Sequence, residues 1–324
     1  MYYVVVNPAS RSGRGAKIWA LLEPVLRREN IPYRAYLSEG PGHVVRIVQD
    51  LTVPLRDSPK GTFCRLIVLG GDGTLNEVLQ GIADFDRVQL GYIPTGSSND
   101  LARDLYLTRE PVQILRQILS CGQATKMDLG CVRYESVSKE TSRKHGKDLL
   151  SVRYFSVSSG IGFDAAVCEE ALSSRFKNIL NKLGLGKLTY LVIALKQLIA
   201  ARKVSCDLYL DGNDPVHIDK FLFVAGMVHQ YEGGGFKFCP GADFCDGLLD
   251  ICAVGDISKL LVLFALPTAF TGSHYRFNGI DRYRAGKLRL VTSLPLWVHT
   301  DGEVAQKADA ITLTCEKEKL QMLL

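Results

Sequence analysis

The 324-residue sequence lacks paired cysteines, long apolar runs and a strong charge of either sign. None of its nine cysteines forms a Cys-x-x-Cys pair, which argues against a zinc ribbon or a disulfide framework. The gaps between Cys239, Cys245 and Cys252 also fit no zinc motif. The most apolar helical stretch, 188–201, contains Lys196 and is too short to cross a bilayer. Reduced thiols and the absence of a spanning segment predict a cytoplasmic protein, at most peripheral to a membrane.

Several recognition signatures are missing as well. The sequence has no Walker A motif, no Gly-x-Ser-x-Gly and no His-Glu-x-x-His, so these three catalytic classes are excluded. The N-terminus has no basic region or cleavage site of a signal peptide. No basic run is interleaved with aromatic residues, so we expect no nucleic-acid partner. The net charge of +5 is compatible with a nucleotide or an anionic membrane surface.

The most informative stretch is 64–77, in which an apolar run leads into Gly70-Gly71-Asp72-Gly73-Thr74 and then into helical spacing. Strand, glycine turn and helix start together aim unpaired backbone N–H groups at one spot, which suits a phosphate. Asp72 adds a carboxylate where a phosphate-bound Mg²⁺ needs one. The alternative is a plain capped turn between strand and helix.

The order of the remaining elements predicts two halves. Strands at 2–6, 33–37, 64–69 and 90–94 alternate with helices, which indicates a parallel sheet whose ligands bind at the carboxyl ends of the strands. Beyond Lys126 the expected strands follow one another and indicate an antiparallel β-sandwich, interrupted by helices near 164–183 and 187–202. These strands are 128–134, 151–158, 205–211, 217–228, 248–254, 287–298 and 309–315. The polar stretch 136–148 is typical of an exposed hairpin tip.

Three glycine- or acid-rich motifs occur in the second half. Residues 158–166 match the dinucleotide fingerprint Gly-x-Gly-x-x-Ala, but the acidic residue expected about 20 positions later is absent. Asp243, Asp246 and Asp250 are either turn residues or ligands of a hard cation. His299-Thr-Asp-Gly-Glu303 follows a strand and is either a hairpin turn or a pair of working carboxylates.

Taken together, these motifs resemble the diacylglycerol kinase catalytic-domain family, which is related to sphingosine kinases and distantly to NAD kinases. The matching motifs run through nearly the whole chain: Asn7-Pro8 with Ser12-Gly13-Arg14-Gly15, Gly70 to Glu77, Gly96 to Asp100, Gly160 to Asp164, Asp246-Gly-Leu248 and Asp301-Gly-Glu303. The resemblance implies an α/β fold with an N-terminal parallel-sheet nucleotide-binding domain (1–126 and 305–324, the last strand returning to it). Residues 127–304 would form a β-sandwich lipid-substrate domain.

The resemblance also implies roles for individual residues. Glu303 would be the general base, with Asp301 beside it and Asp72 holding or orienting the Mg²⁺. A structural metal would be bound by the side chain of Asp246 and the carbonyls of Asp243 and Leu248. ATP would be bound by Asn7, Pro8, Ala9, Ser10, Arg11, Ser38, Gly71, Asp72, Gly73, Thr74, Asn76, Glu77 and Ser97. Ser38 and Ser97 stand where the family often has threonine, and both keep the hydroxyl.

The sequence therefore predicts an ATP- and Mg²⁺-dependent lipid kinase that converts diacylglycerol to phosphatidic acid. A kinase for a long-chain base, a prenol or NAD, and a non-catalytic nucleotide-binding regulator, are the alternatives. Residues 261–266 and Phe270 are either core or receivers of an acyl chain, and the basic stretches 175–187 and 276–287 either meet an anionic bilayer or are a solvated face. The expected partners are a lipid substrate and, transiently, a membrane surface, with a homodimer left open.

Overall fold

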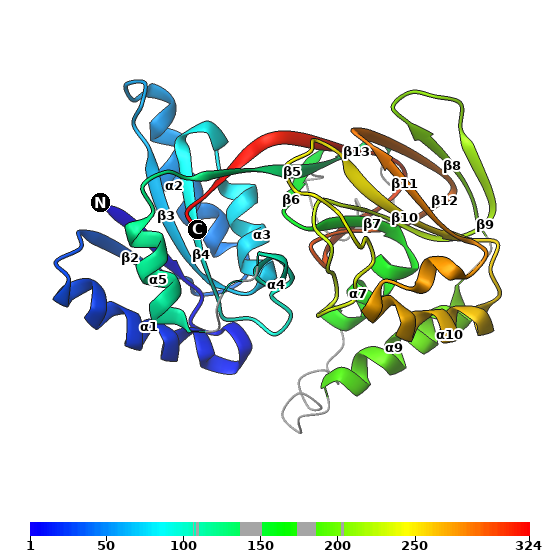
Figure 1. The fold of residues 1–324 in the computed structure, drawn as a ribbon, viewed down its shortest axis with the longest axis horizontal. Coiled ribbons are helices and arrows are strands. Elements are labelled where there is room, and N and C mark those ends of the chain that lie inside the picture. Colours follow the sequence, from blue (N-terminus) through cyan, green and yellow to red (C-terminus); the bar gives the residue numbers. More distant parts are fainter. Residues whose placement is uncertain (106, 108–109, 137–150, 174–185, 202–203) are drawn as a thin grey trace.

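The computed structural model describes residues 1–105, 107, 110–136, 151–173, 186–201 and 204–324. Its first half is a parallel sheet with helices on both faces (Figure 1). The strands lie in the order β2-β1-β3-β4, with bounds β1 (Tyr2–Val6), β2 (Tyr33–Leu37), β3 (Cys64–Gly70) and β4 (Val88–Pro94). The helices are α1 (Ser10–Arg28), α2 (His43–Thr52), α3 (Asp72–Gly81), α4 (Asp100–Asp104) and α5 (Pro111–Ser120), with short 3₁₀ segments at Val53–Asp57 and Phe85–Arg87.

Alternation along the buried strands explains the two helical layers. Leu66 and Val68 of β3 pack in one cluster with α2 and α3, while Ile67 and Leu69 pack in another with α1 and α5. Successive side chains of a strand point to opposite faces, so a central parallel strand is apolar wherever both faces are covered, as from Leu66 to Leu69. The continuous apolar run of β3 is the sequence signal of this arrangement.

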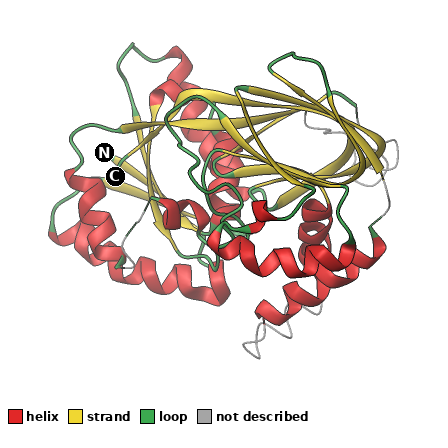
Figure 2. Ribbon diagram, turned by 45° about the vertical axis from the view of Figure 1, so that its right-hand side comes forward, coloured by secondary structure: helices red, strands yellow, loops and turns green. Residues whose placement is uncertain are grey.

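The second half is built of antiparallel strands around a core of its own (Figure 2). Nearly all the residues of this core come from strands, so the strands enclose it without help from the helices. The strands are β5 (Thr125–Tyr134), β6 (Val152–Phe155), β7 (Ser158–Gly162), β8 (Val204–Leu210), β9 (Val216–Met227), β10 (Leu249–Gly255), β11 (Ile280–Ala285), β12 (Lys287–Thr300) and β13 (Glu303–Met322). The helices are α7 (Phe163–Ser173), α9 (Gly186–Ala200) and α10 (Lys259–Thr268), followed by 3₁₀ segments at Ala269–Thr271 and His274–Arg276.

The long strand β13 joins the two halves. It pairs antiparallel with β12 and β5, and its end then pairs in parallel with β4 through Gln321–Gln89 and Met322–Leu90. Both chain ends consequently lie beside the first-half sheet (Figure 1). The expected strand 309–315 is thus the middle of a much longer one.

Two elements differ from the sequence expectations. The strand expected at 151–158 is two strands, because the backbone between them turns to donate hydrogen bonds to Asp301. The basic stretch 276–287 contains β11, whose Arg282 and Arg284 form ion pairs with Asp250 and Asp246. The hairpin tip expected at 136–148, the end of the helix expected at 164–183 and most of the basic stretch 175–187 fall largely outside the described residues. Within the described part of the chain, no helix is long and apolar enough to cross a membrane.

Candidate active site

The centre of the site is the turn between β3 and α3. Gly71 precedes the first helical residue, Asp72, and approaches the loop after β4 so closely that a Cβ on it would lie 3.0 Å from the Cα of Gly96. A Cβ on Gly96 would lie 2.6 Å from the Cα of Gly71. The first N–H groups of α3 have no partner within the helix, and the helix dipole makes this end partly positive. The two loops therefore form one corner at the carboxyl ends of β3 and β4, which we call the anion-binding corner because its backbone N–H groups suit an anion.

The loop after β1 completes this corner. Asn7 Nδ2 donates to Thr74 Oγ1 of α3 over 2.9 Å, and the hydroxyl groups of Ser10 and Thr95 are 2.6 Å apart. Asn7 Oδ1 accepts the N–H of Ala9, and Pro8 O accepts the N–H of Ala16. Beyond them, Arg11 has a left-handed backbone (φ 42°), so α1 starts with a kink at this loop. The residues predicted to bind nucleotide in segments 7–11 and 71–74 are thus brought together.

The other predicted nucleotide contacts lie around this corner with different partners. Ser38 N donates to the carbonyl of Val6 at the end of β1, and Ser97 is exposed in the loop after β4. Glu77 Oε1 accepts the N–H of Gly42 and so holds the start of α2.

Asn76 connects the two halves of the chain. Its side chain is buried, donates to Asp301 Oδ2 over 3.0 Å and accepts from Arg153 Nη2 over 2.7 Å. Arg153 in turn donates to Thr300 Oγ1, beside the turn that carries Asp301. In this structure Asn76 therefore ties α3 to the second half, and its role as a nucleotide contact stays a prediction.

Asp72 and Asp100 bring two carboxylates to the corner. Asp72 accepts the N–H groups of Asn99 (2.8 Å) and Asp100 (3.0 Å), and Asp100 accepts the N–H of Gly234 (3.1 Å). Burial raises the pKa of Asp72 to about 7, and the nearby carboxylates of Asp100 and Asp301 add to this rise. Burial likewise raises the pKa of Asp100 to about 6. Neighbouring buried negative charges of this kind favour either a bound cation or a retained proton.

Asp301 has its hydrogen-bonding capacity filled. It sits in the turn between β12 and β13 with a left-handed backbone (φ 50°). Its carboxylate accepts the N–H groups of Ser156, Val157 and Ser158, the hydroxyl of Ser156 and the side-chain amide of Asn76, over 2.8 to 3.2 Å. We infer that Asp301 fixes the turn and α3 relative to each other.

Glu303 is the carboxylate that lies against the predicted phosphate loop, residues 71–74. It begins β13, and its Oε1 lies so close to α3 that a Cβ on Gly73 would be 2.4 Å away. Gly73 is in the first turn of α3, next to Asp72. The structure thus brings Glu303, from the far end of the sequence, onto the helix N-terminus built by residues 71–74.

A second titratable cluster lies behind this turn. His299 Nε2 is 3.0 Å from Asp164 Oδ2 and 3.2 Å from Glu232 Oε1, and His299 Nδ1 accepts the N–H of Gly302. Burial raises the pKa of Glu232 to about 7. Burial lowers the pKa of His299, but the carboxylates of Glu232 and Asp164 outweigh this effect and raise the pKa to about 9.

The metal site predicted at Asp243, Asp246 and Leu248 has protein partners in this structure. Asp246 Oδ1 accepts the N–H of Leu248 over 2.9 Å, and its Oδ2 pairs with Arg284. Asp243 Oδ1 accepts the N–H of Cys245. The structural metal stays a prediction, and Arg284 is the group that a cation would displace.

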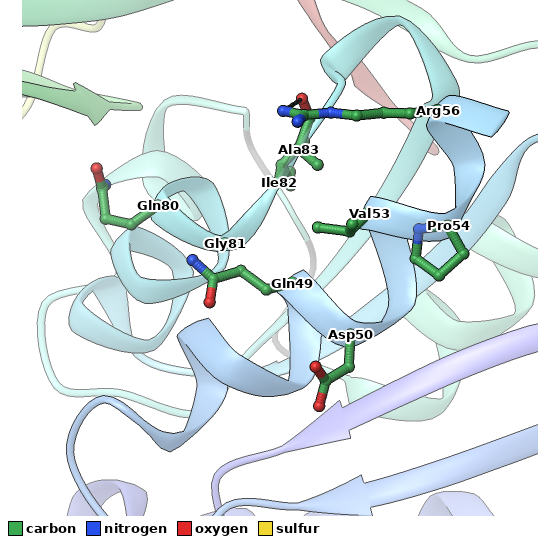
Figure 3. A pocket seen from close by; sticks show the side chains of 9 residues that line it. All are labelled: Gln49, Asp50, Val53, Pro54, Arg56, Gln80, Gly81, Ile82 and Ala83. Atoms are coloured by element: carbon green, nitrogen blue, oxygen red, sulfur yellow. Dashed lines mark hydrogen bonds between the residues drawn. The ribbon is translucent and has the colours of Figure 1, made fainter.

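A hollow of about 600 Å³ lies at the opposite end of α3 (Figure 3). It is lined by Gln49, Asp50, Val53, Pro54, Arg56, Gln80, Gly81, Ile82 and Ala83. This hollow is formed by the last turn of α3, whereas Asp72 and Gly73 are in its first turn, so it is separate from the carboxylate cluster.

Sequence reasoning missed several residues of the site. Asp100, Asp164 and His299 belong to motifs that were named from the sequence, but no role in the site was assigned to them. Their contacts show that they hold loops and carboxylates in place. Glu232 and Arg153 had no sequence signal, because they meet their partners only through the tertiary fold.

Two family models match the chain. The "Diacylglycerol kinase catalytic domain" matches residues 1–132, and the "YegS C-terminal NAD kinase beta sandwich-like domain" matches residues 156–324. The predicted resemblance is thereby confirmed, as is the coarse fold of a mixed α/β protein with a sandwich-like second part.

Named relatives agree with these matches. A diacylglycerol kinase of Mycobacterium tuberculosis (strain CDC 1551 / Oshkosh) is 30% identical over 76% of this chain and 72% of its own length. A diacylglycerol kinase of Bacillus subtilis (strain 168) is 24% identical over 93% of this chain and 88% of its own. A crystal structure of a diacylglycerol kinase from Bacillus anthracis str. Sterne superposes with a TM-score of 0.70 at 20% identity, over 99% of this chain and 96% of that one, and shows that the fold is shared.

Proposed function

Because the chain belongs to the diacylglycerol kinase catalytic-domain family, we propose that it is an ATP- and Mg²⁺-dependent lipid kinase. Its acceptor is the free hydroxyl of diacylglycerol, and its product is phosphatidic acid. The observation that carries this proposal is the position of Glu303, which comes from the second half of the chain and lies against Gly73 at the N-terminus of α3.

The anion-binding corner suits the phosphates of ATP. The N-terminus of α3 offers backbone N–H groups, and the loop after β1 adds the side chains of Asn7, Ser10 and Arg11 next to it. These groups bind and orient a triphosphate without a Walker A lysine. Orientation of this kind supplies most of the catalysis in phosphoryl transfer.

The carboxylates near α3 fit a divalent cation. Asp72 and Asp100 offer oxygen donors, the ligand type that Mg²⁺ prefers. Burial, with nearby carboxylates adding to it, raises the pKa values of both groups, and a bound cation would offset this cost of burying their charge. Mg²⁺ bound here supplies charge neutralisation for the phosphates. Asp72 also holds the N-terminus of α4, so it orients the β4 loop that faces the phosphates.

Glu303 acts as the general base. The hydroxyl oxygen of the lipid forms the new bond to the γ-phosphorus while the bond from that phosphorus to the oxygen of the departing ADP breaks, and the hydroxyl proton passes to Glu303. Through its five hydrogen bonds, Asp301 holds the turn that leads to Glu303 in position.

The two domains have different roles in this proposal. Residues 1–126 and 305–324 form the nucleotide-binding domain, and 127–304 the lipid-substrate domain. The pairing of the end of β13 with β4 supports the return of the chain to the first domain. The protein works in the cytoplasm and contacts the membrane during turnover.

A transfer assay with a panel of acceptors tests the proposal. Radiolabelled phosphate from ATP is followed in mixed micelles with Mg²⁺, offering diacylglycerol, sphingosine and undecaprenol separately, with NAD as a soluble acceptor. Label on diacylglycerol alone is the expected result. Label on another acceptor keeps the mechanism and refutes the substrate, and bound ATP with no transfer to any acceptor refutes the kinase and favours a regulator.

A further inference from the structure

The second half carries a large apolar surface on two neighbouring helices. On α9, Val192, Leu195 and Ile199 are 61%, 42% and 70% exposed, and their spacing places them on one side of the helix. On α10, Leu260 and Phe264 are 65% and 64% exposed. Leu263 of α10 and Phe270, in the 3₁₀ segment that follows α10, are also exposed, and we call these seven residues the apolar helix surface.

These two helices form one continuous edge of the molecule. Lys259 at the start of α10 donates to the carbonyls of Ile199 (2.7 Å) and Ala201 (2.9 Å) at the end of α9. Figures 1 and 2 both show the two helices lying together outside the strands. Val262 and Ala265 of α10 are buried, so one side of this helix packs against the protein. Its exposed apolar side chains lie on the remaining surface of the helix.

The charge of these helices has one sign. The sequences of α9 and α10 contain Lys187, Lys196 and Lys259 and no aspartate or glutamate. Lys196 pairs with Glu170 of α7 yet remains 68% exposed. Exposed apolar side chains on helices that carry lysine and no acidic residue suit contact with the interface of an anionic bilayer.

The apolar helix surface is also connected to the carboxylate cluster. Phe270 stacks on Phe236, with ring centroids 4.1 Å apart. Phe236 exchanges two backbone hydrogen bonds with Glu232, and Gly234 between them donates to Asp100. A path of packed residues therefore leads from this surface to the proposed phosphoryl-transfer site.

We propose that the apolar helix surface binds this protein to a lipid bilayer. The loop 232–236 connects the bound surface to the proposed phosphoryl-transfer site. This inference rests on the proposed function, since a bilayer is where a lipid acceptor resides. Exposed contiguous apolar side chains are uncommon on a protein that stays in water, and burying them in the acyl boundary releases the free energy of their hydration. Lys196 and Lys259 lie on the same helices and attract this edge to anionic headgroups.

Vesicle sedimentation with the full chain tests the proposal. The probes are vesicles of phosphatidylcholine alone and of phosphatidylcholine with phosphatidylglycerol, both without substrate, so the result does not depend on catalysis. The test variant combines Val192→Ser, Ile199→Ser and Leu260→Ser. The control combines Leu21→Ser and Phe63→Ser, which are 61% and 45% exposed on the first half.

We expect the test variant to partition into the mixed vesicles at least about tenfold more weakly than the wild type, and the control to partition equally well. Phosphate transfer to vesicle-embedded diacylglycerol should fall in parallel, while transfer to a short-chain diacylglycerol below its micelle concentration should stay unchanged. If no acceptor is ever phosphorylated but the binding difference stands, the proposed function fails and the docking surface survives.

Two results would overturn the docking surface. One is equal vesicle binding by the wild type and a test variant whose thermal unfolding shows that it is folded. The other is a wild-type dimer by light scattering that the test variant dissociates, because the surface would then be covered by a second copy of the chain.

Discussion

Asp301 accepts five hydrogen bonds from β7, the residues before it and α3, whereas Glu303, two residues later, projects against the phosphate loop. The two acidic residues of the Asp301-Gly-Glu303 motif therefore have different surroundings and different roles. Asp301 fixes the geometry of the turn, and Glu303 is the residue that we propose to meet the substrate. This distinction depends on which donors surround each carboxylate, which the Asp-Gly-Glu pattern alone does not reveal.

Asp301→Asn should destabilise the fold, because its amide nitrogen cannot accept the hydrogen bonds now made to one carboxylate oxygen. We expect a loss of about 3 kcal/mol in the free energy of unfolding, measured by denaturant titration. The exposed turn residue Asp214, changed to Asn, serves as the control. Equal stability of both variants would contradict the anchoring role.

The Glu232 carboxyl, with a pKa of about 7, predicts a pH dependence of stability. A raised carboxyl pKa means that the folded state retains a proton that the unfolded state releases, so this group's contribution is present below about pH 4 and is lost as the pH rises through about 7. Glu232→Gln mimics the protonated form. Its melting temperature should match that of the wild type at pH 5 and exceed it by a few degrees at pH 8.5; a wild type that is the more stable at pH 8.5 would refute this.

At the scale of elements, the N-terminus of α3 depends on glycines for close approach. A Cβ on Gly73 would lie 2.4 Å from Glu303 Oε1, which is the far end of a flexible side chain and can move aside. The helix itself tolerates alanine. Replacement should therefore displace the base and leave the fold intact.

Gly73→Ala should lower kcat by about a hundredfold with little change in melting temperature, because a misplaced base loses most of its effect. Gly122→Ala, where a Cβ would meet nothing within 4 Å, is the matched control. A fully active Gly73→Ala enzyme would show that Glu303 does not work from this position.

Most elements of the first half can be predicted from local sequence patterns. The strand 33–37 was predicted with its observed bounds, and the turn 70–74 was recognised because strand, glycines and helix follow one another directly. The strand β11 was not predicted, because Arg282 and Arg284 form ion pairs with residues on or beside β10. These charged residues obscure the alternation of apolar and polar side chains that indicates a strand. The break between β6 and β7 was equally invisible, since its cause, Asp301, is more than a hundred residues away.

At the scale of the whole molecule, one side chain bridges the halves beside the site. Arg153 of β6 donates to Asn76 of α3 and to Thr300 of β12. It thereby connects α3, the helix proposed to bind phosphates, with the strand that leads to Glu303. No feature of the sequence marks this arginine, because both partners are distant along the chain.

Arg153→Ala should loosen this connection and lower kcat by at least about tenfold, while the Kd for ATP changes little, because the phosphate loops remain in the first half. Arg133→Ala, an exposed arginine on β5, is the control. Loss of ATP affinity with normal kcat at saturation would place Arg153 in nucleotide binding instead of bridging.

The most direct test of the account is the turnover of Glu303→Gln with diacylglycerol in mixed micelles, measured beside its Kd for ATP. We predict that kcat falls by about 10² to 10⁴-fold while ATP binding is unchanged, because the variant keeps the phosphate corner and loses only the proton acceptor. Unchanged turnover in this variant would contradict the assignment of Glu303 as the base and, with it, the proposed meeting of the two halves in catalysis.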